Sequence, residues 1–232
     1  MQTLRPAQQR GHANHGWLDS HHTFSFGSYY DPKEMGFSIL RVINEDQVSP
    51  GMGFDTHSHQ DMEIVSYVLS GALEHKDSLG NGSVIVPGDV QRMSAGSGIT
   101  HSEFNHSSSE PVHFLQIWLQ PNQFGVSPGY EQKNFPAELR HGKMTLLVSP
   151  DGREGSLSSH QDGFLYSALL SANESISHSL DAHRKVYIHV ARGKADVDGC
   201  QIKSGDGLKI QLKNTLNIRA ITDAEILLFD LP

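Results

Sequence analysis

The sequence predicts an all-β protein built from two tandem β-barrels, and three observations support this prediction. Glycine is abundant, with 22 residues in a chain of 232, and apolar residues seldom repeat at the 3.6-residue period of a helix. Short apolar or alternating segments are separated by turns that contain glycine, proline, asparagine or aspartate. The second half of the chain also echoes the first, as tandem copies of one β-unit would.

Taken in order, the N-terminal half alternates between expected strands and turns. After a polar opening loop, expected strands cover residues 22–26, 37–43, 64–70, 84–93 and 113–121. Asn81 and Gly82 are typical of a hairpin turn. The segment 122–143 is rich in polar residues and proline, and we interpret it as a linker.

The C-terminal half repeats three features of the first half. The similar segments are 67–71 with 187–193, 87–90 with 204–208, and 113–121 with 225–232. This repeat predicts an N-terminal domain over residues 1–134 and a C-terminal domain over residues 140–232, each a β-barrel.

Two short stretches of the N-terminal half carry side chains that bind metals. His57 and His59 form one pair and His101 and Glu103 form another, each with one residue between its members. Residues i and i+2 of a strand project from the same face, so two neighbouring strands can aim three imidazoles and one carboxylate at one point. This donor set suits a divalent transition metal. Glu63 has the same parity as His59, and a bulge between them would turn its carboxylate away.

The second half lacks such pairs. Residues 178–184 and 212–216, where the pairs would fall, contain no His-x-His or His-x-Glu. We therefore expect one metal site per chain, in the N-terminal half.

Composition argues against several other classes of protein. The net charge of −8 and the absence of a basic block argue against direct binding to nucleic acid. No apolar run is long enough for a signal peptide or a membrane span, so we expect a cytoplasmic protein with no membrane partner. Cys200 is the only cysteine, which excludes a disulfide framework and fits a reducing compartment.

These residues resemble the two sequence motifs of cupins. The matching residues are Gly51, His57, His59, Glu63 and Gly71 in the first motif and Gly98, His101 and Asn105 in the second. One extra residue precedes Gly71, and Gly96 replaces the usual proline of the second motif. The resemblance implies a bicupin, with two tandem cupin-type barrels of the double-stranded β-helix or jelly-roll kind.

A His-x-His pair with a His-x-Glu pair, in a bicupin whose second barrel lacks ligands, resembles the pirin family and within it the bacterial pirin-like quercetin 2,3-dioxygenases. The opening Arg10-Gly-His and the segment Thr23-Phe-Ser-Phe also look pirin-like. The resemblance selects Glu103 rather than Glu63 as the ligand, beside His57, His59 and His101. It implies a flavonol or another small aromatic enol as substrate and dioxygen as co-substrate.

The expected cofactor is one divalent transition metal per chain, with Fe(II) placed before Mn, Ni, Cu, Co or Zn. Glu103 is the expected catalytic residue, as a base toward the substrate hydroxyl. Asn105 has the parity to face the same interior, and Gln116 either hydrogen-bonds nearby or faces solvent. We expect a monomer. The alternative hypothesis is a non-enzymatic, metal-binding regulator that acts through a protein partner, the role proposed for eukaryotic pirins.

Overall fold

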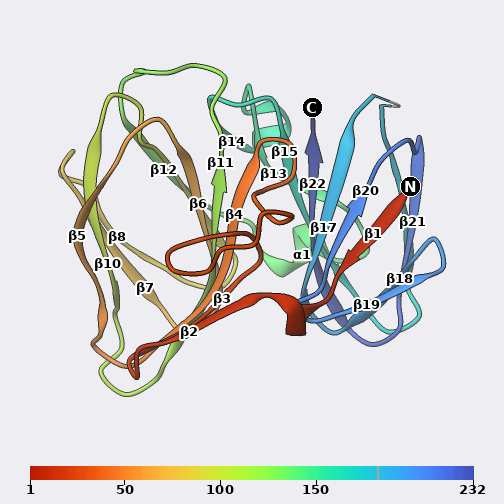
Figure 1. Cartoon of the computed structure of the whole chain (residues 1–232), viewed down its shortest axis with the longest axis horizontal. Coiled ribbons are helices and arrows are strands. Elements are labelled where there is room, and N and C mark those ends of the chain that lie inside the picture. Colours follow the sequence, from red (N-terminus) through yellow and green to blue (C-terminus); the bar gives the residue numbers. More distant parts are fainter. Residues whose placement is uncertain (182) are drawn as a thin grey trace.

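The computed structural model describes residues 1–181 and 183–232. In these residues, each half of the chain is a sandwich of two sheets whose strands are mostly antiparallel. Figure 1 shows the N-terminal half on the left and the C-terminal half on the right. The strands of the N-terminal half are β2 (Gly11–Asn14), β3 (Leu18–His22), β4 (Leu40–Val48), β5 (Gly53–His59), β6 (Glu63–Ser70), β7 (Leu73–Asp77), β8 (Gly82–Ile85), β9 (Asp89–Ser94), β10 (Ile99–Asn105), β11 (Val112–Leu119) and β12 (Gly129–Asn134).

The C-terminal half follows a short helix, α1 (Ala137–Arg140). Its strands are β13 (Thr145–Ser149), β14 (Leu157–Ser158), β15 (Phe164–Leu170), β16 (Ser175–Ser179), β17 (Lys185–Arg192), β18 (Lys194–Val197), β19 (Cys200–Lys203), β20 (Gly207–Ile210), β21 (Thr215–Ala220) and β22 (Ala224–Leu231). The predicted all-β class and its two barrels are therefore confirmed.

The two halves have the same strand order. The four-stranded sheets run β5-β10-β7-β8 and β16-β21-β18-β19, and the seven-stranded sheets contain β9-β6-β11-β4 and β20-β17-β22-β15. Gly71 and Gly193 end the corresponding strands β6 and β17 with φ angles of 78° and 79°. A Cβ at either glycine would overlap the backbone of a neighbouring segment. The sequence repeat thus corresponds to a structural one.

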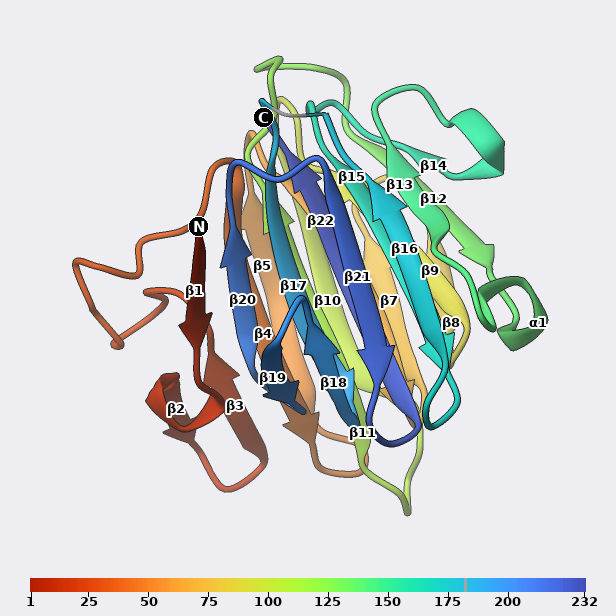
Figure 2. The same cartoon turned by 90° about the vertical axis from the view of Figure 1, so that its right-hand side faces the viewer.

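One edge strand crosses from the N-terminal end of the chain to the C-terminal sheet. β1 (Gln2–Arg5), at the N-terminus, pairs with β20 of the C-terminal half, and β12 pairs with β9 of the N-terminal half. Figure 1 shows β1 in red, reaching across to the right-hand barrel, and Figure 2 shows it beside β20. Residues 2–5 fall in the predicted N-terminal domain, yet their sheet is the C-terminal one. We propose that the boundary between the two folding units lies between β12 and β13.

Side chains alternate between two environments along each central strand. On β6, Val65, Tyr67 and Leu69 face the C-terminal half and join an apolar core between the two large sheets, which also contains Tyr187 and Phe229. Ile64 and Val68 face the interior of the N-terminal barrel instead. A residue of β6 therefore lies either between the halves or inside the barrel, according to its parity.

Three local predictions were wrong. The first predicted strand, 22–26, lies largely beyond β3, which ends at His22, and the second, 37–43, begins too early because β4 starts at Leu40. The predicted linker, 122–143, contains β12, an edge strand of the N-terminal sheet. Edge strands often carry charged or polar residues in place of an alternating apolar pattern, so they are harder to recognise in a sequence. In the described part of the chain, none of the helices has the length and apolar character needed to cross a membrane.

Candidate metal centre

The predicted ligands lie on the inner face of the four-stranded sheet of the N-terminal barrel. His57 and His59 come from β5, and His101 comes from the neighbouring strand β10. The ring centroids are 4.5 Å apart for His57 and His101, 4.8 Å for His57 and His59, and 4.9 Å for His59 and His101. One nitrogen from each ring lies within 4.8 Å of the others. The structure thus brings the three histidines together.

A β-bulge in β5 sets the direction of His57. His57 pairs with His101, but Phe54 pairs with Glu103, so two residues of β5 lie opposite one residue of β10. His57 Nδ1 lies 2.7 Å from the carbonyl oxygen of Asp55, within the bulge. A carbonyl only accepts, so Nδ1 carries the proton and donates it there, which leaves the Nε2 lone pair for a ligand.

Glu103 is buried two residues beyond His101. Its carboxylate accepts hydrogen bonds from Gln116 Nε2 at 2.7 Å and from Ser66 Oγ at 3.2 Å. A carboxylate oxygen of Glu103 lies within 4.8 Å of nitrogens of His101 and His75. His101 is therefore common to the histidine trio and to the group that contains Glu103. Of the two alternatives for Gln116, the hydrogen bond is confirmed.

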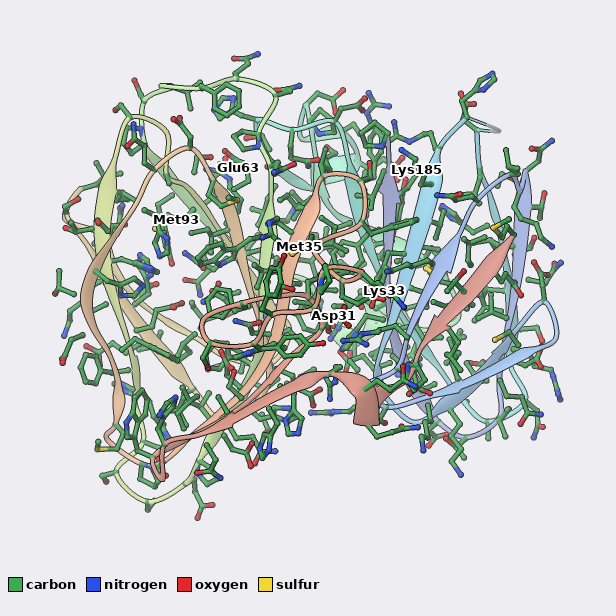
Figure 3. The ribbon with its side chains drawn as sticks, in the orientation of Figure 1. Asp31, Lys33, Met35, Glu63, Met93 and Lys185 are labelled. Atoms are coloured by element: carbon green, nitrogen blue, oxygen red, sulfur yellow. The ribbon has the colours of Figure 1, made fainter. Side chains whose placement is uncertain are left out.

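Glu63 lies on the other side of the barrel wall. Its carboxylate accepts hydrogen bonds from Ser94 Oγ and from Ser159 Oγ of the C-terminal half, each at 2.8 Å. Asp61, with a φ angle of 48°, turns the chain between β5 and β6, so Glu63 begins a strand of the seven-stranded sheet. Figure 3 labels Glu63 near the start of β6, and Lys185 near the start of the corresponding strand β17. Glu63 ties the two halves together and does not join the histidines.

Burial keeps two of the histidines neutral. It lowers the pKa of His59 to about 4 and that of His101 to about 3, and neighbouring imidazoles add to both effects. Neutral imidazoles offer a lone pair, which is the form that binds a metal. The Nε2 atom of His101 is also buried and has no hydrogen-bond partner among the described residues.

A cavity of about 200 Å³ opens beside this cluster. Leu18, Phe26, Phe54 and Trp118 supply apolar walls, and the β2–β3 hairpin covers one side. Burial raises the pKa of Asp46, another lining residue, to about 7. Apolar and polar side chains both line the cavity, as is usual for sites that bind small molecules.

Asn105 faces inward as its parity predicts, but its side chain forms hydrogen bonds with backbone groups. Its Nδ2 atom donates to the carbonyl oxygens of Val48 and Glu110, and its Oδ1 atom accepts from the N–H of Ser107. Asn105 therefore holds the loop after β10.

Sequence reasoning assigned no role at the site to two residues behind the histidine cluster, His75 and Asp77. They lie on β7, the neighbour of β10 on the side away from β5, and both side chains are fully buried. The signal was present, because His75-Lys-Asp77 is a third pair with one residue between its members.

Comparisons with known proteins agree with this architecture. The family model described as Pirin matches residues 3–119, and the model described as Quercetinase C-terminal cupin domain matches residues 146–231. The chain belongs to the pirin family. Its two barrels are therefore cupin domains, as the resemblance predicted.

Two curated pirin relatives span almost the whole chain. A protein of Escherichia coli K12 named quercetin 2,3-dioxygenase is 52% identical over 229 residues, covering 99% of this chain and 98% of its own. A pirin-like protein of Caulobacter vibrioides is 41% identical and covers 97% of each chain.

Solved structures of the E. coli pirin YhhW agree closely with this fold. One has a TM-score of 0.96 at 51% identity, covering 100% of this chain and 98% of that one. A complex of YhhW with nickel(II) has a TM-score of 0.95 at 50% identity, covering 100% and 99%. A quercetin 2,3-dioxygenase from Acinetobacter baumannii, at 18% identity and a TM-score of 0.79, shares the fold.

Proposed function

We propose that this pirin is a metal-dependent dioxygenase that cleaves flavonols such as quercetin. The observation that carries the proposal is the cluster of His57, His59 and His101 at the wall of an apolar cavity, with Glu103 beside it. The name of the 52% identical relative supports the reaction class, and the nickel(II) complex of YhhW supports a divalent metal.

The residues present fit a divalent transition metal. His57 and His101 each present an Nε2 lone pair, and His101 Nε2 is buried with no partner among residues 1–181 and 183–232. His59 is neutral, and Glu103 supplies an anionic oxygen that offsets the charge of a cation. We therefore assign His57, His59, His101 and Glu103 as the ligands. When bound, the metal supplies Lewis acidity that lowers the pKa of an enolic hydroxyl at the site.

The chain's own residues then hold the substrate and its proton. Phe54 and Trp118 line the cavity with flat rings, which suit an aromatic substrate. Glu103 is the acceptor for the hydroxyl proton, while Gln116 and Ser66 keep its carboxylate in place.

The test follows oxygen uptake and carbon monoxide release with quercetin after loading the purified protein separately with Fe(II), Mn(II), Ni(II), Cu(II) or Co(II). We expect turnover with at least one metal, and loss of both metal binding and turnover in Glu103→Ala. Full activity of that variant would refute the role of Glu103. Tight metal binding with no turnover of any flavonol would favour the alternative, a metal-binding regulator.

A further inference from the structure

A buried row of side chains runs from β10 to β7 behind the candidate metal centre. His101 Nδ1 lies 3.4 Å from His75 Nδ1, and His75 Nε2 lies 3.2 Å from Asp77 Oδ2. The register explains the row, because β10 pairs with β7 through His101 and Asp77 and through Glu103 and His75. Neither His75 nor Asp77 has exposed side-chain surface.

The carboxylate of Asp77, at one end of this row, determines which nitrogen of His75 carries a proton. Asp77 accepts hydrogen bonds from Asn81 Nδ2 at 2.9 Å and from the N–H of Leu79 at 2.9 Å. Burial by itself would raise the pKa of Asp77. The hydrogen bonds from Asn81, His75 and Leu79 have the larger combined effect and hold this pKa below its usual value. Asp77 is thus a carboxylate, which can only accept, so His75 Nε2 carries a proton and donates it.

The remaining step fixes His101. A neutral His75 with its proton on Nε2 has a lone pair on Nδ1, which can accept from His101 Nδ1–H. His101 then keeps the lone pair on Nε2, the atom that is buried and has no partner in the part of the chain that the structure describes. His57 reaches the same state by a different route, through the Asp55 carbonyl oxygen.

We propose that His75 and Asp77 are positioning residues that fix the tautomer and the ring orientation of His101 for metal binding. This inference rests on the proposed ligand role of His101. Partners of this kind hold the ring of a metal-binding histidine and raise its basicity, and their loss typically weakens metal binding about 10–100-fold.

A packing role for His75 is the competing explanation. Its ring stacks on Tyr130, with centroids 4.9 Å apart and planes at 29°. Two variants separate the explanations, because His75→Phe keeps a stacked ring but cannot accept a hydrogen bond. His75→Gln loses the ring, but its amide can accept from His101 and donate to Asp77.

The experiment measures the Ni(II) affinity of the metal-free full-length protein by competition with a chelator. We expect His75→Phe to bind Ni(II) about 10–100-fold more weakly than wild type. His75→Gln should lie closer to wild type, and Asp77→Asn should lie between wild type and His75→Phe because an amide oxygen accepts less strongly than a carboxylate. The control is His106→Gln, which removes an exposed histidine paired at 3.0 Å with Glu74, a residue of β7 whose side chain points to the opposite face from that of His75. The Ni(II) affinity of this variant should be unchanged.

Wild-type affinity in His75→Phe would overturn the proposal, and so would weaker binding by His75→Gln than by His75→Phe. Thermal unfolding of each metal-free variant shows whether it has folded.

A second readout needs no metal. Two-dimensional ¹⁵N NMR of the imidazoles in metal-free wild type should show His101 protonated at Nδ1, and His75→Phe should reduce the population of that tautomer. A proton on Nε2 in the wild type would overturn the positioning role even if His101 is a ligand. Unchanged Ni(II) affinity in His101→Ala would instead refute the ligand assignment and the proposed function with it.

Discussion

The two barrels share one strand order, but the interior of the N-terminal barrel carries polar side chains and that of the C-terminal barrel is apolar. In the N-terminal barrel, the inner face of β10 presents His101 and Glu103. β21 holds the corresponding place in the C-terminal barrel, where Leu216 and Ile218 are fully buried in an apolar core. The correspondence follows from register, because Asn105 pairs with Leu73, two residues after Gly71, and Ala220 pairs with Ala195, two residues after Gly193.

The large sheets differ in the same way. Ser66 and Gln116, which hold Glu103, are cross-strand partners on β6 and β11. The ladder of β6 with β11 begins at the pair Glu63 and Leu119, and that of β17 with β22 begins at Lys185 and Leu231. Three residues further along, the counterparts of Ser66 and Gln116 are the partners Ile188 and Leu228. Both belong to the apolar core of the C-terminal barrel.

One of the proposed ligand positions has the same residue type in both barrels. His57 pairs with His101, and His178 pairs with Leu216, so His178 is the counterpart of His57. The comparison teaches that the fold alone makes no site. A site requires polar residues on both sheets at once, because a buried carboxylate needs hydrogen-bond donors opposite it.

The largest effect is expected when two residues of the N-terminal barrel are replaced by their counterparts from the C-terminal barrel. The double variant His101→Leu with Glu103→Ile should bind no Ni(II) in equilibrium dialysis, because it removes two of the four proposed ligands. Its fold should persist, since both new side chains occur at the matching positions of the other barrel. Retained stoichiometric binding would break the comparison.

The apolar pair of the C-terminal barrel should matter for stability alone. Leu228→Ala should lower the free energy of unfolding by about 2–5 kcal/mol, because it leaves a cavity in a fully buried core. Urea denaturation measures the loss. Ni(II) affinity should stay at the wild-type value, and a joint loss of both would show that the barrels are coupled.

The polar pair of the N-terminal barrel should matter for metal affinity. Gln116→Leu removes the 2.7 Å hydrogen bond to Glu103, and bonds to charged groups contribute about 1.5–3 kcal/mol. We expect Ni(II) affinity to fall about tenfold or more by chelator competition. The exposed Gln120→Leu is the matched control, and equal effects of the two variants would contradict the role of Gln116.

The effect expected to be smallest at neutral pH concerns acid stability. Tyr67 of β6 and His189 of β17 occupy matching positions, opposite Leu115 and Leu227. Burial, and after it the charge of Arg10, lowers the pKa of His189 to about 4. Between about pH 6.5 and pH 4, His189 is therefore protonated in the unfolded chain and neutral in the folded chain. Stability is therefore lost as the pH falls from about 6.5 toward 4, by up to about 1.4 kcal/mol per pH unit.

The variant His189→Leu tests this sign. Urea denaturation between pH 7 and pH 4 should show a shallower loss of stability than in wild type, by about one proton. At pH 7 the variant should be at least as stable, because neither ring nitrogen of His189 has a partner among the described residues. An unchanged slope would show that His189 does not contribute.

Local patterns along the chain were informative where they arise within one strand. The pairs His57/His59 and His101/Glu103 could be placed on strand faces because side-chain alternation has a fixed period of two. The turn glycines Gly71 and Gly193 could be matched because each ends a strand with the same backbone geometry. Parity within β10 also predicted that Asn105 faces inward, but not that its partners would be backbone groups of neighbouring loops.

The sequence by itself determined the all-β class, the duplicated barrel and the three histidines that meet at one point. Strand parity left Glu63 and Glu103 open, and the family resemblance favoured Glu103. The tertiary structure shows where Glu63 lies, through the turn at Asp61 and the serines that hold Glu63 between the halves. It also decided that β1 joins the C-terminal sheet, that β12 forms an edge of the N-terminal sheet and that His75 lies behind His101. The physical reason is that parity is a property of one strand, whereas pairing between strands depends on long-range contacts that no local pattern encodes.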